Sequence, residues 1–370
     1  MKILHAGNLM NLGYINTKYL RNVNIDAELL MEIDPPVGSD PLPFDSTLNN
    51  KFPPWINFYN KKKSSWKFQI IKKMREKQYD LIHAYVELPI FSYLSRKPFI
   101  VQTQGSDFRE LALTNSIRGI LLRRAYKKAK LIILSQADHT KLISKFKLNN
   151  TIFMPMMCNT DFFSPKHFEK KLVEDKFVVF HPTRQNWKGK KNYILIQGFA
   201  KFVKKYSNSI LVVLNFGPDS NKVKELVSSL GIEKNVHLIE QRLDSMKLLE
   251  YYNRCDVIAD QFGITGSIGS TTLEAMSCEK PLLISVDKKL HRELYGEEIP
   301  AMRTVDPDSV SNALEILQDD AIRRNIGQSS RKWVLKHHST QVIIKKLQII
   351  YSGISNGESI INIREKLVLH

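Results

Sequence analysis

The chain contains few cysteines and no long apolar run. Its 370 residues include 3 cysteines, Cys158, Cys255 and Cys278. Their odd number and their spacing fit neither a zinc site nor a disulfide framework, so we expect reduced, mostly buried thiols. No apolar stretch reaches the roughly 18 residues that a transmembrane helix requires. Residues 1–7 are too short an apolar start for a signal peptide. These absences lead us to expect a cytoplasmic protein.

Acidic residues are also scarce relative to basic ones. The chain holds 37 Asp and Glu against 55 Lys and Arg, a net charge of +18. Such a balance favours anionic partners, namely nucleic acid, an anionic membrane surface or phosphorylated substrates. The sequence shows no zinc-finger, RNA-recognition or helix-turn-helix signature, so we expect no nucleic acid. Hydrophobic residues at 43% and charged residues at 25% are typical of a globular protein.

Strands alternate with helices along the whole chain. A strand at 2–7, a loop that ends at Gly13 and a helix open the sequence as they open a doubly wound parallel sheet, and a second series of strands starts at 177. We therefore predict an α/β protein with two Rossmann-like, doubly wound domains. The proline-rich residues 34–60 are predicted to be a long loop.

The length suits two domains. The predicted boundaries give a first domain at 1–166 and a second at 167–340. Residues 341–370 are predicted to be a helix and tail, for which packing against the first domain is one option.

The stretch 255–286 combines a strand, a loop of small residues, a helix and a further strand. A loop of Gly, Ser and Thr that enters a helix leaves backbone N–H groups unpaired and suits an anion such as a diphosphate. A carboxylate in the first helical turn can accept hydrogen bonds from a sugar diol. The alternative is an ordinary loop with a glutamate beside the helix dipole. The candidate residues are Gly266, Ser267, Gly269, Ser270 and Glu274.

The residues 273–278, LEAMSC, followed by Lys280-Pro281, resemble the nucleotide-sugar loop of family 4 retaining glycosyltransferases. The resemblance implies that Glu274 holds the ribose of the donor. The first glutamate of the family's paired-glutamate pattern is replaced here by Gly266. The pair Asp260-Gln261 is similar to that of a subgroup that lacks this glutamate, and is therefore predicted to contact the donor.

Two cations follow the strand predicted at 177–181. Arg184 comes shortly after that strand and Lys190 precedes a helix. Arginine can hold a diphosphate through two hydrogen bonds, and lysine neutralises it as a point charge. The family resemblance implies that this pair binds the donor diphosphate and stabilises the departing nucleotide, so both are predicted to be catalytic. A solvated basic loop is the alternative.

The first domain presents polar residues where two predicted strands end. The strand from Tyr79 is predicted to end near His83, and the strand from Pro98 runs into Gln104, Gly105, Ser106 and Asp107. Ligands of open α/β sheets bind at the carboxyl ends of strands. The segment 104–107 resembles the family's acceptor-side motif, with Gln104 at a frequent histidine position. The resemblance implies an acceptor site with Gly13 and His83, and Asp107 near the reacting sugar. A helix cap by Ser106 or Asp107 is the alternative.

Aromatic residues alternate with lysines between 55 and 77, and the helix predicted at 117–130 is basic on one side. Rings at headgroup depth beside ammonium groups suit the surface of an anionic membrane. The alternative is a helix whose apolar side packs on its own sheet.

Taken together, the resemblance implies a GT-B fold and retaining transfer of a sugar from a nucleotide-diphosphate sugar. The acceptor would be a glycan or a lipid-linked molecule, in the synthesis of a cell-surface polysaccharide or glycoconjugate. No cofactor and no metal are expected, since GT-B enzymes stabilise the leaving phosphate with cations and helix dipoles. Two alternatives remain open: a GT-B protein that binds a nucleotide sugar without transferring it, and a GT-B nucleotide-sugar epimerase.

Overall fold

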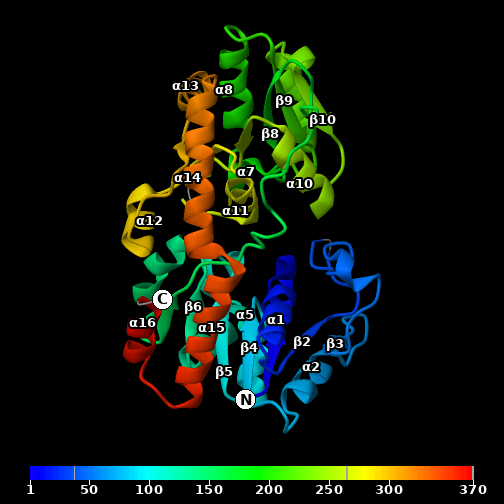
Figure 1. The fold of residues 1–370 in the computed structure, drawn as a ribbon. Coiled ribbons are helices and arrows are strands. Elements are labelled where there is room, and N and C mark those ends of the chain that lie inside the picture. The colour runs from blue at the N-terminus through cyan, green and yellow to red at the C-terminus, as the bar shows by residue number, and fades with distance from the viewer. Residues whose placement is uncertain (37, 264–265, 369–370) are drawn as a thin grey trace. The chain divides into compact units, whose positions relative to one another are not determined.

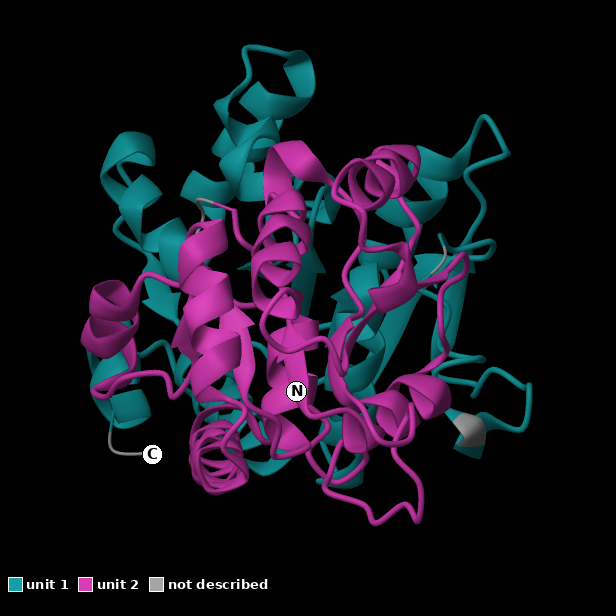
Figure 2. Ribbon diagram, turned by 90° about the horizontal axis from the view of Figure 1, so that it is seen from above, with its two compact units in different colours: residues 1–157, 340–370 teal, residues 158–339 magenta. Residues whose placement is uncertain are grey.

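The computed structural model describes residues 1–36, 38–263 and 266–368. It divides into two compact units (Figures 1 and 2). Unit 1 comprises residues 1–157 together with 340–370, and unit 2 comprises 158–339. The chain therefore leaves unit 1 after Met157 and returns to it at Thr340, so unit 1 includes the C-terminal segment.

Unit 1 is built on a seven-stranded parallel sheet in the order β3-β2-β1-β4-β5-β6-β7. The strand order reverses beside β1, as in doubly wound folds. The strands are β1 (Ile3–Ala6), β2 (Ala27–Glu32), β3 (Ile56–Tyr59), β4 (Leu81–Tyr85), β5 (Phe99–Thr103), β6 (Ile132–Leu134) and β7 (Thr151–Phe153). The α-helices are α1 (Leu12–Asn22), α2 (Trp66–Met74), α3 (Leu88–Ser95), α4 (Ser106–Arg109), α5 (Ile117–Lys128), α6 (Ile143–Phe146), α15 (Thr340–Ser355) and α16 (Ile360–Val368).

Strand β3 corrects the prediction of a structureless loop at 34–60. Residues Ile56–Tyr59 pair in parallel with Leu29–Glu32 of β2 and form the edge of the sheet. The prolines at 53 and 54 precede the strand, where a missing N–H costs no ladder bond. The high proline content hid a short strand that begins directly after them.

Successive residues of the unit 1 strands enter different cores. Leu4, Ile82 and Val101 belong to one apolar cluster with residues of α2, α3 and α5. Their neighbours Ile3, Leu81 and Ile100 belong to another, which includes residues of α1, α15 and α16. This alternation is that of a sheet covered by helices on both faces. The C-terminal helices α15 and α16 thus complete the core of unit 1 (Figure 1).

Unit 2 contains a six-stranded parallel sheet in the order β10-β9-β8-β11-β12-β13. The strands are β8 (Phe177–His181), β9 (Ser209–Leu214), β10 (Val236–Ile239), β11 (Val257–Ala259), β12 (Leu282–Ile284) and β13 (Met302–Arg303). The α-helices are α7 (Trp187–Lys190), α8 (Tyr193–Val203), α9 (Ser220–Ser229), α10 (Ser245–Arg254), α11 (Ser270–Ser277), α12 (Lys288–Tyr295), α13 (Pro307–Ile316) and α14 (Asp320–His338). The predicted fold class of two parallel, Rossmann-like α/β domains is confirmed.

Candidate functional site

The carboxyl ends of β8 and β11 lie side by side, because these strands pair directly in the unit 2 sheet. Asp260, immediately after β11, is buried and joins the two ends. Its carboxylate accepts hydrogen bonds from the hydroxyl of Thr183 at 3.0 Å and from that of Thr272 at 2.5 Å. Asp260, predicted as a donor contact, thus ties the loop after β8 to helix α11.

His181, at the end of β8, shapes the loop that carries the predicted cations. Its Nδ1 donates to the carbonyl of Ala259 at 2.8 Å, and its Nε2 accepts from the Asn192 amide at 2.8 Å. The same Asn192 side chain accepts from the backbone nitrogen of Asn186 at 2.8 Å. Burial lowers the pKa of His181 to about 4, so the ring is neutral with its proton on Nδ1. Sequence reasoning missed His181 and Asn192, although both flank the predicted cation loop.

Arg184 and Lys190 lie at the two ends of this loop. Arg184 is exposed, and Lys190 is partly buried at the last residue of the single-turn helix α7. The carbonyl of Lys190 accepts a hydrogen bond from the backbone nitrogen of Phe262 at 2.8 Å. A Cβ atom at Gly263 would overlap the carbonyl oxygen of Gly189. The structure therefore brings the loop that runs from Arg184 to Lys190, here called the cation loop, against the loop that leads from β11 to α11, here called the donor loop.

The amino end of α11 lies at the end of that donor loop. Gly269 is the N-cap residue, and a Cβ atom there would meet no heavy atom within 4 Å. Ser270 is exposed. Ser267 is buried, and its carbonyl accepts a hydrogen bond from the Gln261 side-chain amide at 2.7 Å. The helix thus presents open backbone amides where an anion can approach. Positions 264 and 265 of the predicted loop lie outside the described residues.

Glu274 is the fifth residue of α11 and not in its first turn as predicted, because the helix begins only at Ser270. The residue is partly exposed. Its carboxylate accepts a hydrogen bond from the hydroxyl of the buried Tyr252 at 2.9 Å. Desolvation raises the pKa of Glu274 to about 7, and the Tyr252 hydrogen bond lowers it only in part. A carboxylate held in this way has further lone pairs that can accept from a diol.

In unit 1, Asp107 folds back on the loop after β5. It is 4% exposed and accepts from the backbone nitrogens of Gly105 at 2.6 Å and Gln104 at 3.2 Å. Desolvation raises the pKa of Asp107 to about 6 despite these donors. The side-chain oxygen and nitrogen of Gln104 are buried and have no hydrogen-bond partner, while Ser106 is exposed. The loop therefore offers an unpaired amide and an exposed hydroxyl next to a buried carboxyl.

His83 is fully buried inside β4, which ends at Tyr85 and not at His83 as predicted. Its Nδ1 lies 2.7 Å from the hydroxyl of Tyr351 on α15, and that hydroxyl lies 3.3 Å from His5 Nε2. His5 Nδ1 in turn lies 2.7 Å from the hydroxyl of Tyr85, which also accepts from the Asn16 amide at 3.0 Å.

The direction of these hydrogen bonds follows from the single proton on each hydroxyl. Tyr85 accepts from Asn16 and so donates to His5 Nδ1, which leaves the His5 proton on Nε2 facing Tyr351. Tyr351 then donates to His83 Nδ1. Burial lowers the pKa of His5 to about 3 and that of His83 well below its usual value, so both rings are neutral. In this structure His83 connects the sheet to the C-terminal helix.

Gly13 occupies the start of α1. A Cβ atom there would overlap the carbonyl of Gly7, so glycine allows the helix to approach the end of β1. The Asn8 side chain holds the intervening turn by accepting from the backbone nitrogen of Tyr14 at 2.7 Å and donating to the carbonyl of Ser39 at 2.8 Å. Asn8 is a loop-shaping residue that the sequence analysis did not single out.

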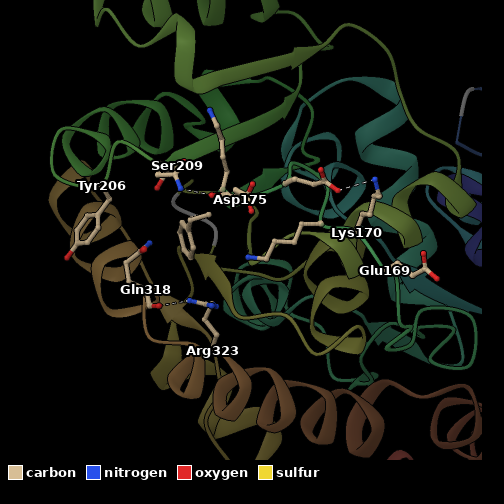
Figure 3. Close-up of a pocket in the computed structure, with 12 residues that line it drawn as sticks. Glu169, Lys170, Asp175, Tyr206, Ser209, Gln318 and Arg323 are labelled. Carbon is tan, nitrogen blue, oxygen red and sulfur yellow. Dashed lines mark hydrogen bonds and ion pairs between the residues drawn. The ribbon is translucent and has the colours of Figure 1, made fainter.

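A hollow of about 610 Å³ in unit 2 lies at the start of β8, at the opposite end of that strand from Arg184 (Figure 3). Arg323 donates to the carbonyl of Gln318 at 2.8 Å, an interaction that Figure 3 marks. Lys170 pairs with Glu174 at 3.2 Å. Both acidic and basic residues line the hollow, which lies away from Arg184 and α11. The hollow is therefore distinct from the predicted donor loop.

Carboxylates with metal-site spacing have other partners. Asp306 and Asp308 form an Asp-x-Asp pair, but Asp306 caps α13 by accepting from Ser309 N at 2.8 Å and Asp308 pairs with Lys201 at 2.6 Å. Within residues 1–36, 38–263 and 266–368, no group of three or more His, Cys, Asp or Glu is placed to hold a metal ion.

The sequence and the fold are similar to those of known glycosyltransferases. Residues 163–333 match the family model described as glycosyl transferases group 1. An uncharacterized glycosyltransferase of Methanocaldococcus jannaschii is 24% identical over 305 residues, 71% of this chain and 74% of the relative. The capsular polysaccharide biosynthesis glycosyltransferase CapM of Staphylococcus aureus is 28% identical over 185 residues, 49% of this chain and 47% of CapM.

A solved structure of Anabaena HepE in complex with UDP-glucose covers 95% of this chain and 100% of its own, with a TM-score of 0.72 and 16% identity. The likeness shows a shared GT-B architecture. The matched family model spans the cation loop, the donor loop and α11, and the chain is thus similar to GT-B glycosyltransferases. The family 4 assignment and its motif roles stay predictions.

Proposed function

We propose that this protein is a glycosyltransferase that takes its sugar from a nucleotide-diphosphate sugar bound by unit 2. One observation carries the proposal: the backbone of Lys190 is hydrogen-bonded to that of Phe262, so the cation loop and the donor loop form one surface at adjacent strand ends. The group 1 family match over 163–333 and the UDP-glucose complex of HepE, which has the same fold, support it.

In this proposal, each part of the surface has one task. Arg184 and Lys190 neutralise the diphosphate, and the open backbone amides at the start of α11 donate hydrogen bonds to its oxygens. Glu274 accepts hydrogen bonds from the ribose diol. Cations and amides held in place before the reaction stabilise the charge that develops on the leaving nucleotide. No cofactor and no metal are required.

We propose transfer with retention of configuration. The bond from C1 of the sugar to the β-phosphate oxygen breaks, and the acceptor oxygen forms its bond to C1 on the same face. The acceptor hydroxyl passes its proton to the departing phosphate, so no protein nucleophile is needed. Asp107 and the Gln104 amide of unit 1 are proposed to contact the acceptor, because both present polar atoms after the end of β5.

The acceptor is proposed to be a glycan or lipid-linked molecule, because helix α5 has a surface suited to an anionic membrane. Ile117 is 78% exposed and Ile120 is 37% exposed near its start. Farther along, Arg124 and Lys127 face Lys145 and Lys147 across a hollow of about 380 Å³ with no acidic residue in its lining. No helix in the described part of the chain is long and apolar enough to span a bilayer.

The function is tested by melting the protein with UDP-, GDP-, ADP- and dTDP-sugars, followed by assay of the stabilising donor with lipid-linked and free glycan acceptors. We expect one nucleotide class to raise the melting temperature and one acceptor to gain a sugar. Arg184→Ala should lower kcat by about 10²–10³-fold, the usual loss for one charge-stabilising group. Arg303→Ala, which removes another exposed arginine of unit 2, serves as the control.

Anomeric retention is read from the product by NMR. Undiminished turnover in Arg184→Ala would refute the assigned role of that arginine. Donor binding without transfer to any acceptor would favour the binding-protein alternative, and isomerisation of the donor sugar would favour the epimerase.

A further inference from the structure

Gly266 has a backbone conformation that leaves no room for a side chain. Its φ is +64°, and a Cβ atom there would lie 2.8 Å from the Cβ of Asp287 and 3.0 Å from the Asp287 backbone nitrogen. A residue with a side chain at this position would therefore be both strained and obstructed. At Gly266 the donor loop therefore has no side chain with which to hold its own position.

Two donors from the start of α12 hold the carbonyl oxygen of Gly266 instead. The backbone nitrogen of Asp287 donates to it at 3.3 Å, and Nε2 of His291 lies 3.0 Å away. A carbonyl oxygen only accepts hydrogen bonds, so His291 Nε2 carries the proton and donates it. Two donors to one oxygen restrict the orientation of that peptide group.

The imidazole of His291 is itself held rigidly. It is fully buried and stacks on Tyr295, one helical turn farther along α12, with ring centroids 5.6 Å apart and 9° between the planes. Tyr295 packs in turn against Trp333 and His337 of α14. The amino end of α12 is capped by Asp287, which accepts from the backbone nitrogen of Leu290 at 3.1 Å. The donor to Gly266 thus projects from a packed cluster of aromatic rings.

The backbone next to Gly266 is also hydrogen-bonded to residues that follow strands β11 and β12. The carbonyl of Ser267 accepts from the Gln261 amide at 2.7 Å, and the carbonyl of Gln261 accepts from the backbone nitrogen of Ser285 at 2.8 Å. Gly266 and Ser267 are therefore fixed from the ends of β11 and β12, directly before the open amides at Gly269 and Ser270.

We infer that His291 is a positioning residue of the donor loop: its hydrogen bond to Gly266 orients the loop so that the amides at the start of α11 meet the donor diphosphate. The identity of the ligand in this inference depends on the proposed function. The effect of His291 on the loop does not depend on it. His291 touches no substrate in this assignment.

The test compares three variants. His291→Gln keeps an N–H donor on a side chain of similar reach, and His291→Leu removes the donor. His337→Leu is the matched control, because His337 packs on the same Tyr295 ring but is on α14. Donor Kd by calorimetry, KM and kcat are measured for each, together with amide hydrogen exchange of the segment 266–273 in protein without ligand.

We expect His291→Leu to raise the donor Kd and KM by about tenfold with a smaller change in kcat. His291→Gln should stay within about threefold of the parent protein. Exchange in 266–273 should accelerate in His291→Leu and not in His337→Leu, although both should melt at a lower temperature.

Equal exchange in the segment for His291→Leu and the parent would overturn the inference, as would a donor Kd unchanged in His291→Leu. If the parent protein binds no nucleotide sugar, the proposed function fails, and the exchange comparison still decides whether His291 orders the loop.

Discussion

The backbone nitrogen of Phe262 donates to the carbonyl oxygen of Lys190 at 2.8 Å. This bond connects two segments that are far apart in the sequence, and it forms because β8 and β11 are neighbours in the sheet. Close approach of the two backbones requires a residue without a side chain at Gly263, where a Cβ atom would overlap the Gly189 carbonyl. The proposed donor surface therefore depends on packing between two loops as well as on its charged side chains.

Gly263→Ala should separate the two loops. We expect a loss of about 1–3 kcal/mol in unfolding free energy, as for other overpacked sites, and a donor Kd raised at least several-fold. Gly269→Ala is the control for stability, because its Cβ would meet no heavy atom within 4 Å and its φ of −119° suits alanine. Thermal melts and donor titrations check both variants. Equal melting temperatures for the two would contradict the predicted overlap.

The sequence singled out the charged residues of the proposed donor surface but not the residues that support them. Glu274, Arg184 and Lys190 stood out because charged residues beside glycines at strand ends have few structural explanations. His181 and Asn192 were missed because a buried polar pair leaves no periodic signal, and its value depends on hydrogen bonds to backbone groups from other parts of the chain. The partners of His291 were invisible for the same reason, since Gly266 and the helix that holds it meet only after folding.

The fold could be predicted because apolar strands alternate with helices in both halves of the chain. Short elements were the exception. The four residues of β3 follow two prolines, and the two residues of β13 are too few to show any pattern. His83 shows the same limit for a single residue: the end of β4 could not be placed closely enough to decide between a cleft residue and a core residue.

Glu274 should make both stability and donor binding depend on pH. Its pKa is raised from 4.5 to about 7 by burial, so between these values the folded protein holds a proton that the unfolded chain has lost. Stability from this group is therefore present at low pH and declines as pH rises towards 7. Glu274→Gln should be more stable than the parent at pH 8, by on the order of 1–3 kcal/mol, and equal to it near pH 4.

Donor binding should follow the opposite trend, because only the ionised carboxylate accepts hydrogen bonds from both hydroxyls of a diol. Affinity should rise up to about pH 7 and then level off, and Glu274→Gln should bind weakly at every pH. Glu293→Gln, which changes an exposed glutamate of α12, is the control. Denaturant unfolding and donor titration between pH 5 and pH 8 check both trends. A donor affinity independent of pH would contradict the role given to Glu274.

The α5 surface should bind anionic vesicles. The double variant Arg124→Glu with Lys127→Glu reverses two charges in the basic hollow, and we expect it to lose most binding to vesicles that contain phosphatidylglycerol. Lys204→Glu with Lys234→Glu makes the same change of charge on exposed lysines of unit 2 and should bind as the parent does. Co-sedimentation at low and high salt is the measurement. Equal losses in the two double variants would indicate that net charge, and not this surface, governs binding.

Tyr351→Phe should loosen the C-terminal helices without affecting the donor surface. The Tyr351 hydroxyl donates to His83 Nδ1 and faces the proton on His5 Nε2, so its removal leaves two buried ring nitrogens unpaired. We expect a loss of about 1–3 kcal/mol in unfolding free energy and faster hydrogen exchange in α15, with an unchanged donor Kd.

Tyr126→Phe is the matched control, because that hydroxyl is equally buried but has no hydrogen-bond partner. Its removal should be neutral or stabilising, since an unpaired buried hydroxyl only costs desolvation. Similar losses in the two variants would mean that removal of any buried hydroxyl lowers stability, and that the hydrogen-bond chain through Tyr351 contributes nothing of its own.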